Sequence, residues 1–314
     1  MSPPLIGRTP RHGHPHGRGR SDVRSHLPER DHRARYTLGG TRAALLALPA
    51  VVPVVLVLGV SAIGALAQSL GLLPFIGDPV LSLRGWAGSA DELTRSVLVS
   101  AYIATASTVL SLVVGFAIAV YVLAAPRMGR AVAAISAATI PIPHLIGAGA
   151  IGLLLSDSGF LDRLLGLPPA FPALVGSSGF GAVIIEYAWK ESAFVALVLI
   201  GSMSRSVTGM CDAAATLGAT AWQRILHIVL PLSVPALAVS ALIVFVYTFG
   251  SYESAWLLGP TSPEPVSVRA VRLFGSVDLA ARPEAMATAL VSLAVGLAVI
   301  LAAAAVVQGR RRQR

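Results

Sequence analysis

The sequence predicts an all-α membrane protein with six transmembrane helices. The chain has 314 residues, of which 55% are hydrophobic and only 12% are charged, whereas a soluble domain has roughly 25% charged residues. Six long apolar segments are separated by polar connections, and the arginines are distributed unevenly among those connections. Lipid is therefore the expected main solvent of the folded chain.

Each expected helix is an apolar run that reaches about 20 residues, the length that crosses a bilayer core. The fifth run is the least uniform, because Tyr247, Ser251, Tyr252 and Glu253 lie near its end. The six predicted spans are 44–67, 97–124, 131–155, 181–203, 228–256 and 284–308.

Arginine placement predicts the orientation of these spans. Seventeen of the 23 arginines lie in 1–43, 125–130, 204–227 and 309–314, and six lie in the opposite set of connections. Positive residues stay on the cytoplasmic side, so both termini are expected in the cytoplasm. The basic segment 1–43 is expected to be a disordered tail near anionic lipid rather than a nucleic-acid-binding arm. Residues 44–94 then form the first span and an outer loop, and 309–314 form a basic C-terminus.

Several chemical functions are excluded by what the sequence lacks. Cys211 is the only cysteine, which excludes a disulfide framework and a cysteine-based metal cluster. Lys190 is the only lysine and follows Trp189, so the chain has no phosphate-binding G-x-x-x-x-G-K-[ST] loop and no ATPase site of that kind. We therefore expect neither a catalytic site, nor a metal, nor a cofactor in this chain.

Two glycine-rich stretches resemble functional motifs without their context. "GAGAIG" at 147–152 lies inside an apolar span, where small residues favour close helix packing rather than dinucleotide binding. "GSSG" at 176–179 resembles the Gly-x-Ser-Gly of rhomboid intramembrane proteases. A serine nucleophile needs a base, and the last span contains no histidine, so a protease is a remote alternative.

The long connection 204–227 is predicted to be helical. Asp212 suits an N-cap or first turn, the alanines at 213–215 favour helix, and Gly218 suits a hinge or C-cap. A second short helix is expected through "TAWQRILHI", and Pro231 is expected to end it as the chain enters the membrane.

An apolar stripe runs along this predicted pair of helices. Its members recur at intervals of three and four residues and would face a partner groove: Ala214, Leu217, Ala221 and Ile225.

The same connection resembles a known motif. Asp212-Ala213-Ala214, three residues, Gly218, nine residues, Ile228, one residue and Leu230-Pro231 reproduce the spacing of the EAA loop (residues 211–231 here) of binding-protein-dependent ABC transporter permeases, with Asp for Glu at 212. The resemblance covers about residues 95–308, including "TRSVLVSAYIATASTVLSLVVGFAIAVYVL" and "YAWKESAFVALVLIGSM".

This resemblance implies the type I ABC importer permease fold in a bacterial inner membrane, with cytoplasmic coupling helices. It implies an ATP-binding ABC subunit that uses ATP and Mg, a second permease subunit in a homo- or heterodimer, and an extracytoplasmic substrate-binding protein. The coupling helices would move as a rigid lever when the ATPases close. The expected coupling residues are Asp212, Ala213, Ala214, Leu217, Gly218, Ala221, Ile225, Ile228, Leu230 and Pro231.

Ionisable residues inside spans are candidates for the substrate path. Glu186 and Lys190 are i,i+4 partners in the fourth span, next to Glu191. Mutual neutralisation of these charges, or their extension toward water, is favoured over substrate contact. His144, beside Pro141 and Pro143, marks a break in span three that either lines a cavity or is a packing kink.

Near the outer mouth, Tyr252 and Glu253 are either path residues or interfacial anchors. "AATLGA", "LLGP" and "RPEAMATAL" resemble the polyamine-type branch, so a polyamine or related organic cation is the expected solute. Similar permeases move iron, thiamine, phosphonates and sulfate. An ion-coupled secondary transporter is the alternative function; it would need no ATPase and would leave the EAA-type loop unexplained.

Overall fold

The computed structural model describes residues 40–88, 90–166, 173–203 and 205–312. The predicted basic tail therefore lies almost wholly outside the described residues, as do residues 313 and 314. By its contacts the chain divides into two units, residues 1–54 and 55–314. Only the first part of helix α1 is described in the first unit, and all the features below belong to the second.

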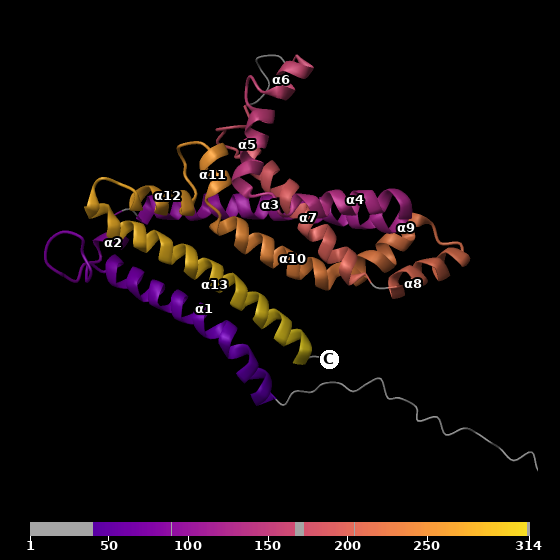
Figure 1. The fold of residues 1–314 in the computed structure, drawn as a ribbon, viewed down its shortest axis with the longest axis horizontal. Coiled ribbons are helices and arrows are strands. Elements are labelled where there is room, and N and C mark those ends of the chain that lie inside the picture. Colours follow the sequence, from indigo (N-terminus) through magenta and orange to yellow (C-terminus); the bar gives the residue numbers. More distant parts are fainter. Residues whose placement is uncertain (1–39, 89, 167–172, 204, 313–314) are drawn as a thin grey trace, which may run out of the picture. The chain divides into compact units, whose positions relative to one another are not determined.

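All regular structure in the described residues is helical, as the sequence predicts (Figure 1). The elements are α1 (Gly40–Ser69), α2 (Arg84–Ala87), α3 (Ala90–Ala124), α4 (Pro126–Thr139), α5 (His144–Leu155), α6 (Phe160–Leu165), α7 (Gly181–Ser202), α8 (Arg205–Thr216), α9 (Ala221–Arg224), a π-helical turn (Ile225–Val229), α10 (Leu230–Gly250), α11 (Glu253–Leu258), α12 (Val266–Phe274), a 3₁₀ turn (Leu279–Ala281) and α13 (Arg282–Arg312).

Helix α7 lies at the centre of the second unit, in contact with α3, α4, α5, α10 and α11. Its longest contact is with α3, whose buried face carries small side chains such as Ser107, Ser111 and Gly115. A Cβ atom at Gly115 would lie 2.7 Å from Cβ of Val195 on α7. Small residues thus let two helices approach closely, which is how helices associate where lipid surrounds them.

Within the residues that the structure describes, five helical segments are long and apolar enough to cross a membrane, against the six that the sequence predicts. They are 45–69, 90–124, 144–165, 221–250 and 279–309. Helix α7 has almost the bounds of the fourth predicted span, but it carries three charged residues, Glu186, Lys190 and Glu191, and is not among the five.

Two predicted spans are interrupted. The third, 131–155, is divided between α4 and α5, and the break lies beside Pro141 and Pro143, as predicted. Proline has no N–H to continue the hydrogen-bond ladder of a helix. The fifth, 228–256, ends as a continuous helix at Gly250, and residues from Glu253 form the separate short helix α11.

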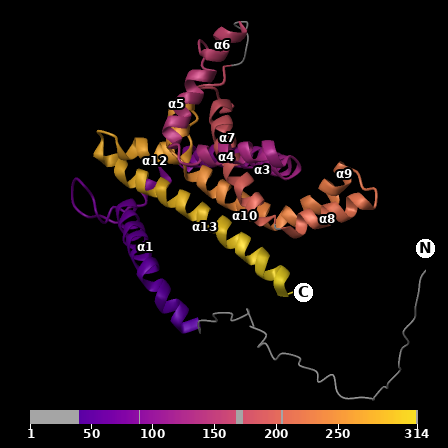
Figure 2. The same cartoon turned by 45° about the vertical axis from the view of Figure 1, so that its right-hand side comes forward.

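Helix α12 lies alongside the start of α13, in contact with it (Figures 1 and 2). Buried Arg269 joins three helices: its Nη1 lies 2.7 Å from Oε2 of Glu92 on α3, and its Nη2 lies 2.5 Å from Oε1 of Glu284 on α13. Nearby, a side-chain hydrogen bond to Glu264 raises the pKa of Arg272. Ion pairs therefore fix the ends of α3, α12 and α13 together.

Candidate coupling loop and membrane-buried ionic cluster

The loop that resembles the EAA motif begins with helix α8 and turns at Gly218. The N–H of Gly218 donates to the carbonyl of Ala215, and that of Ala219 donates to the carbonyl of Ala214, each at 3.0 Å. Gly218 has a φ of +84°, and the pair of hydrogen bonds is a Schellman helix end. The predicted C-cap is confirmed. A Cβ there would meet nothing within 4 Å, so glycine is needed for its backbone conformation and not for space.

Helix α9 begins with a capping box that sequence reasoning missed. The N–H of Gln223 donates to Oγ1 of Thr220 at 3.3 Å, and the N–H of Thr220 donates to Oε1 of Gln223 at 2.8 Å. The signal was available, since T-x-x-Q ahead of an apolar run is a capping-box pattern. Together the Schellman end and the capping box fix the angle between α8 and α9.

Two local predictions in this loop are wrong. Asp212 is not at a helix start, because α8 begins seven residues earlier, at Arg205. Val207 explains the earlier start, since it is buried in a cluster with Ala119 and Leu199. The early turns of α8 therefore pack on the helix bundle.

Pro231 does not end the second helix either. Helical structure is continuous from Ala221 to Gly250. Because Pro231 cannot donate to the carbonyl of His227, the chain forms a π turn, in which the N–H of Leu230 donates to the carbonyl of Ile225. The π turn thus accommodates Pro231 without ending the helix.

The predicted apolar stripe is divided between two surfaces. Leu217 is 88% exposed and Ala221 is exposed, while Ala214 and Ile225 are half-buried. Trp222, which sequence reasoning did not select, is 66% exposed. Large apolar side chains therefore project from both α9 and the end of α8.

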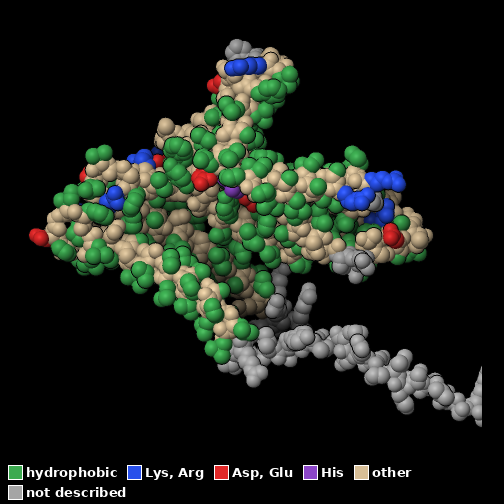
Figure 3. All heavy atoms as spheres, viewed as in Figure 1, with side chains coloured by type: hydrophobic (Ala, Val, Ile, Leu, Met, Phe, Trp, Pro, Cys, Tyr) green, Lys and Arg blue, Asp and Glu red, His purple; other side chains and the backbone are tan. Residues whose placement is uncertain are grey.

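Hollows lie on both sides of these helices. A shallow one of about 470 Å³ is lined by Ala214, Leu217, Gly218, Ala219, Gln223, Arg224, His227 and Ile228. Asp212 lines a second, of about 300 Å³, which α8 and α9 form with the end of α3. Basic side chains gather over the neighbouring ends of α4 and α9 (Figure 3). The region thus combines exposed apolar side chains, a concave surface and positive charge.

The second candidate site is a cluster of ionisable residues where α5 meets α7. His144, the first residue of α5, lies between two carboxylates: its Nδ1 is 3.1 Å from Oε1 of Glu186, and its Nε2 is 3.6 Å from Oε1 of Glu191. Glu186 is fully buried, and its Oε2 has no hydrogen-bond partner among the described residues. Figure 3 shows a histidine beside acidic side chains on an otherwise largely apolar face.

Lys190 does not form the predicted ion pair with Glu186 in the described residues. Its Nζ donates instead to the backbone carbonyls of Thr139, at 3.3 Å, and Ile142. These carbonyls lie at the break between α4 and α5, where the prolines supply no donors. Lys190 therefore caps the broken helix, while Glu186 binds the histidine on the other side of the break.

Aromatic rings and a glycine complete the cluster. The ring of His144 lies 5.1 Å from that of Tyr247 and 5.9 Å from that of Tyr187, centroid to centroid. A Cβ at Gly147 would lie 3.1 Å from Oε1 of Glu186, so α5 approaches α7 closely there. The prediction that "GAGAIG" serves helix packing is thus confirmed at Gly147 and at Gly152, where a Cβ would lie 3.1 Å from Leu258, whereas a Cβ at Gly149 would meet nothing within 4 Å.

The two other predicted path residues lie apart from the cluster. Tyr252 stacks on Trp256 at 5.9 Å between ring centroids, and Glu253 is an exposed residue of the first turn of α11. In the described part of the chain, neither makes a hydrogen bond, ion pair or ring contact with His144, Glu186 or Lys190.

Curated relatives of this chain are transport proteins. It is 28% identical over 194 residues to the inner membrane ABC transporter permease protein YnjC of Escherichia coli K12, covering 61% of this chain and 37% of the relative. It is 26% identical over 190 residues to the ferric transport system permease protein FbpB of Actinobacillus pleuropneumoniae, covering 59% and 26%. It is 29% identical over 101 residues to the trehalose transport system permease protein SugA of Mycobacterium tuberculosis H37Rv, covering 32% and 33%. The chain spans between a quarter and little more than a third of these relatives.

Solved structures share the fold. A chain of a bacterial ABC transporter involved in the import of the acidic polysaccharide alginate superposes with a TM-score of 0.67 at 20% identity, covering 87% of this chain and 96% of that one. A chain of the MetNI methionine ABC transporter in an inward-facing conformation gives 0.54 at 17% identity, covering 71% and 98%. The fold is therefore that of ABC importer permeases. Residues 123–313, more than half of the chain, match the family described as binding-protein-dependent transport system inner membrane component, and the chain belongs to that family.

Proposed function

We propose that this chain is the permease subunit of an ABC importer, which forms the translocation path and couples ATP hydrolysis by a separate ATPase subunit to uptake of a small solute. The observation that carries the proposal is the loop from α8 to the π turn. Its two helices are held at a fixed angle by Gly218 and the capping box, and they expose Leu217 and Trp222. Large apolar side chains grouped on one exposed element favour a protein partner.

The partners follow from this role. The ATPase would cover Leu217, Gly218 and the adjoining hollow, and it would use the ATP and Mg while this chain binds neither. A second permease subunit and an extracytoplasmic binding protein would complete the importer in a bacterial inner membrane, with both termini cytoplasmic. The family's description, and a relative structure of the alginate transporter with a substrate-bound periplasmic protein, support partners of these kinds.

The ionic cluster is our candidate for the solute path. Lys190 donates to backbone carbonyls and forms no ion pair with Glu186 or Glu191 in the described residues, so His144 is the direct partner of both carboxylates. Oε2 of Glu186 is left without a partner among the described residues, and this available carboxylate oxygen favours a positively charged solute such as a polyamine or a related organic cation. The names of the relatives give different substrates. The proposed solute class is therefore supported by these carboxylates and by the resemblance of "AATLGA", "LLGP" and "RPEAMATAL" to the polyamine-type branch. Tyr252 and Glu253 would lie near the outer mouth of the path.

An ion-coupled secondary transporter is the second candidate, because ionisable residues within a membrane often form proton or ion relays. The two candidates differ in their need for an ATPase. A secondary transporter would work without one, and the exposed Leu217 and Trp222 would then have no role.

The test uses two glycine variants of the full chain in nanodiscs. Gly218→Ala forces a side chain into a left-handed conformation that costs roughly 1–2 kcal/mol, so capture of the ATPase should fall about tenfold. Gly209→Ala is the matched control, because Gly209 is an exposed residue within α8 and a Cβ there meets nothing within 4 Å. The control should capture the ATPase as the wild type does.

Uptake and ATPase capture should fall together in Gly218→Ala. If well-folded wild-type protein captured no ATPase and still transported solute down an ion gradient, the importer function would be wrong and the secondary transporter would replace it.

A further inference from the structure

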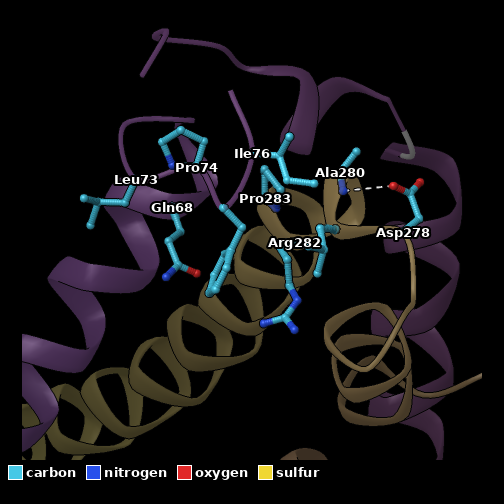
Figure 4. A pocket seen from close by; sticks show the side chains of 10 residues that line it. Gln68, Leu73, Pro74, Ile76, Asp278, Ala280, Arg282 and Pro283 are labelled. Atoms are coloured by element: carbon cyan, nitrogen blue, oxygen red, sulfur yellow. Dashed lines mark hydrogen bonds between the residues drawn. The ribbon is translucent and has the colours of Figure 1, made fainter. Parts of the chain in front are cut away.

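A pocket of about 210 Å³ lies where α1 ends and α13 begins (Figure 4). The loop that follows α1 covers one side of it, and the 3₁₀ turn and first residues of α13 form the other. Its lining residues are Gln68, Leu73, Pro74, Phe75, Ile76, Asp278, Leu279, Ala280, Arg282 and Pro283. It is separate from both the coupling loop and the ionic cluster.

Arg282 is the cation of this pocket. Its guanidinium carbon lies 4.0 Å from the centroid of the Phe274 ring and 4.9 Å from that of the Phe75 ring. An arginine stays protonated in proteins, and contact with aromatic faces stabilises that charge. Rings contact the face of a guanidinium, however, and its N–H groups still need acceptors.

Those acceptors are missing from the described residues. Arg282 makes no hydrogen bond or ion pair with any of them, and its buried Nε has no acceptor. The buried Oε1 of Gln68 also has no partner. In Figure 4 the Gln68 amide and the Arg282 guanidinium point to the same side of the pocket, whereas the carboxylate of Asp278 turns toward Ala280, whose N–H donates to it at 2.9 Å. The pocket therefore presents positive charge that its own acid does not neutralise.

The position of the pocket points to lipid. Gln68 lies at the end of the apolar segment 45–69, and Arg282 lies near the start of the apolar segment 279–309. A site at the ends of two membrane-crossing segments lies at the bilayer boundary, where phospholipid phosphates are found. Its surroundings are apolar and open, since Leu73, Ile76 and Val277 are 54%, 71% and 100% exposed.

We propose that this pocket binds the phosphodiester of a membrane phospholipid. The N–H groups of Arg282 donate to the phosphate oxygens in the paired geometry that guanidinium favours, and the Gln68 amide, whose oxygen and nitrogen are interchangeable by rotation, contributes a further hydrogen bond. The acyl chains lie along α13, where none of the 18-residue apolar stretch of the helix is buried. The same observations favour lipid over an acidic protein surface, because the rim of the pocket is apolar.

Native mass spectrometry of the full chain tests this directly. Protein from nanodiscs containing phosphatidylglycerol or phosphatidylethanolamine is released under conditions that retain tightly bound lipid. Arg282→Gln should reduce the lipid-bound fraction about tenfold, the effect of losing one charge-assisted hydrogen bond. Arg84→Gln is the control, because Arg84 is an exposed arginine on α2 that does not line the pocket; its bound fraction should not change.

Two further variants keep the test decisive if Arg282→Gln folds poorly. Arg282→Lys retains the charge but loses the planar fork and should lower retention severalfold, and Gln68→Leu should lower it less. Retention of both lipids by the wild type identifies the phosphodiester as the bound group, and retention of phosphatidylglycerol alone adds a requirement for an anionic headgroup. Unchanged retention in the Arg282 variants, or an equal loss in Arg84→Gln, overturns the proposal. The proposal is also overturned if an Arg282 variant keeps its bound lipid and loses only its capture of the substrate-binding protein, because the pocket would then be a protein contact.

Discussion

Helix α13 is strongly apolar but exposed, whereas helix α7 carries charged residues but is buried. The apolar segment that contains α13 has a mean hydropathy of 2.8, and none of its 18-residue apolar stretch is buried. Helix α7 carries three charged residues, yet it is the central helix, and its buried residues include Glu186 and Lys190. In water the more apolar helix would be inside. In lipid an apolar surface costs nothing, so the helix with polar groups takes the centre, where those groups find partners.

The largest effect should come from Lys190 on α7. Lys190→Met removes the donor to the carbonyls of Thr139 and Ile142 and leaves buried carboxylates without their nearby cation. The free energy of unfolding should fall by about 3 kcal/mol, measured by denaturant titration in mixed micelles. A variant as stable as the wild type would show that the broken helix needs no cap.

Packing of α7 against α3 should give the next largest effect. Gly115→Ala places a Cβ 2.7 Å from Val195 Cβ and should cost about 2 kcal/mol. Gly296 on α13 is the matched control, since a Cβ there would come no nearer than 3.8 Å to Val246. Gly296→Ala should be neutral or stabilise by up to about 1 kcal/mol, because alanine favours helix over glycine. Equal effects at both sites would contradict the central placement of α7.

A charge change on α7 should affect transport more than stability. Glu186→Gln keeps the shape of the side chain but removes the negative charge beside His144. Stability should fall by about 1 kcal/mol, whereas uptake of a cationic solute should fall about tenfold. Asp91→Asn, at an exposed carboxylate outside the cluster, should leave uptake unchanged. Normal uptake by Glu186→Gln would remove the cluster from the solute path.

The smallest effect should come from the surface of α13. Leu297 is 53% exposed, and Leu297→Ala should change the unfolding free energy of the isolated chain by less than about 0.5 kcal/mol. The same variant should also be measured in the assembled importer. A loss of more than about 2 kcal/mol there, as for leucine truncated in a packed interior, would indicate that a protein subunit, and not lipid, covers this face.

Local patterns in the sequence predicted the helices well. Apolar runs located α13 and, despite its three charged residues, α7 to within a few residues, because a helix that crosses lipid must satisfy its backbone internally and stay largely apolar. Gly218 and the two prolines near His144 located the turn and the break, since each of these residues determines the backbone conformation at its own position. The capping box at Thr220 and the π turn before Pro231 had equally local signals and were overlooked.

Pairings between distant residues could not be predicted from one sequence. Glu186 is placed beside His144, 42 residues away, by the packing of α5 on α7, and Arg269 meets Glu92 across 177 residues. Sequence spacing instead favoured Lys190 as the partner of Glu186, because i,i+4 neighbours share a helix face. The broken helix offered Lys190 the backbone carbonyls of Thr139 and Ile142, and those replaced the carboxylate as its partner.

A small tilt of the unbroken helical segment from Ala221 to Gly250 would produce a larger displacement at its far end. Thirty residues at about 1.5 Å each give a rod of about 45 Å, so a tilt of about 5° at Trp222 displaces the other end by about 4 Å. The hydroxyl of Ser267 on α12 donates to the carbonyl of Ser251, just beyond that end, at 2.6 Å. A rotation too small to disturb the packing at one surface of the membrane would therefore shift α12 at the other by more than the width of an atom.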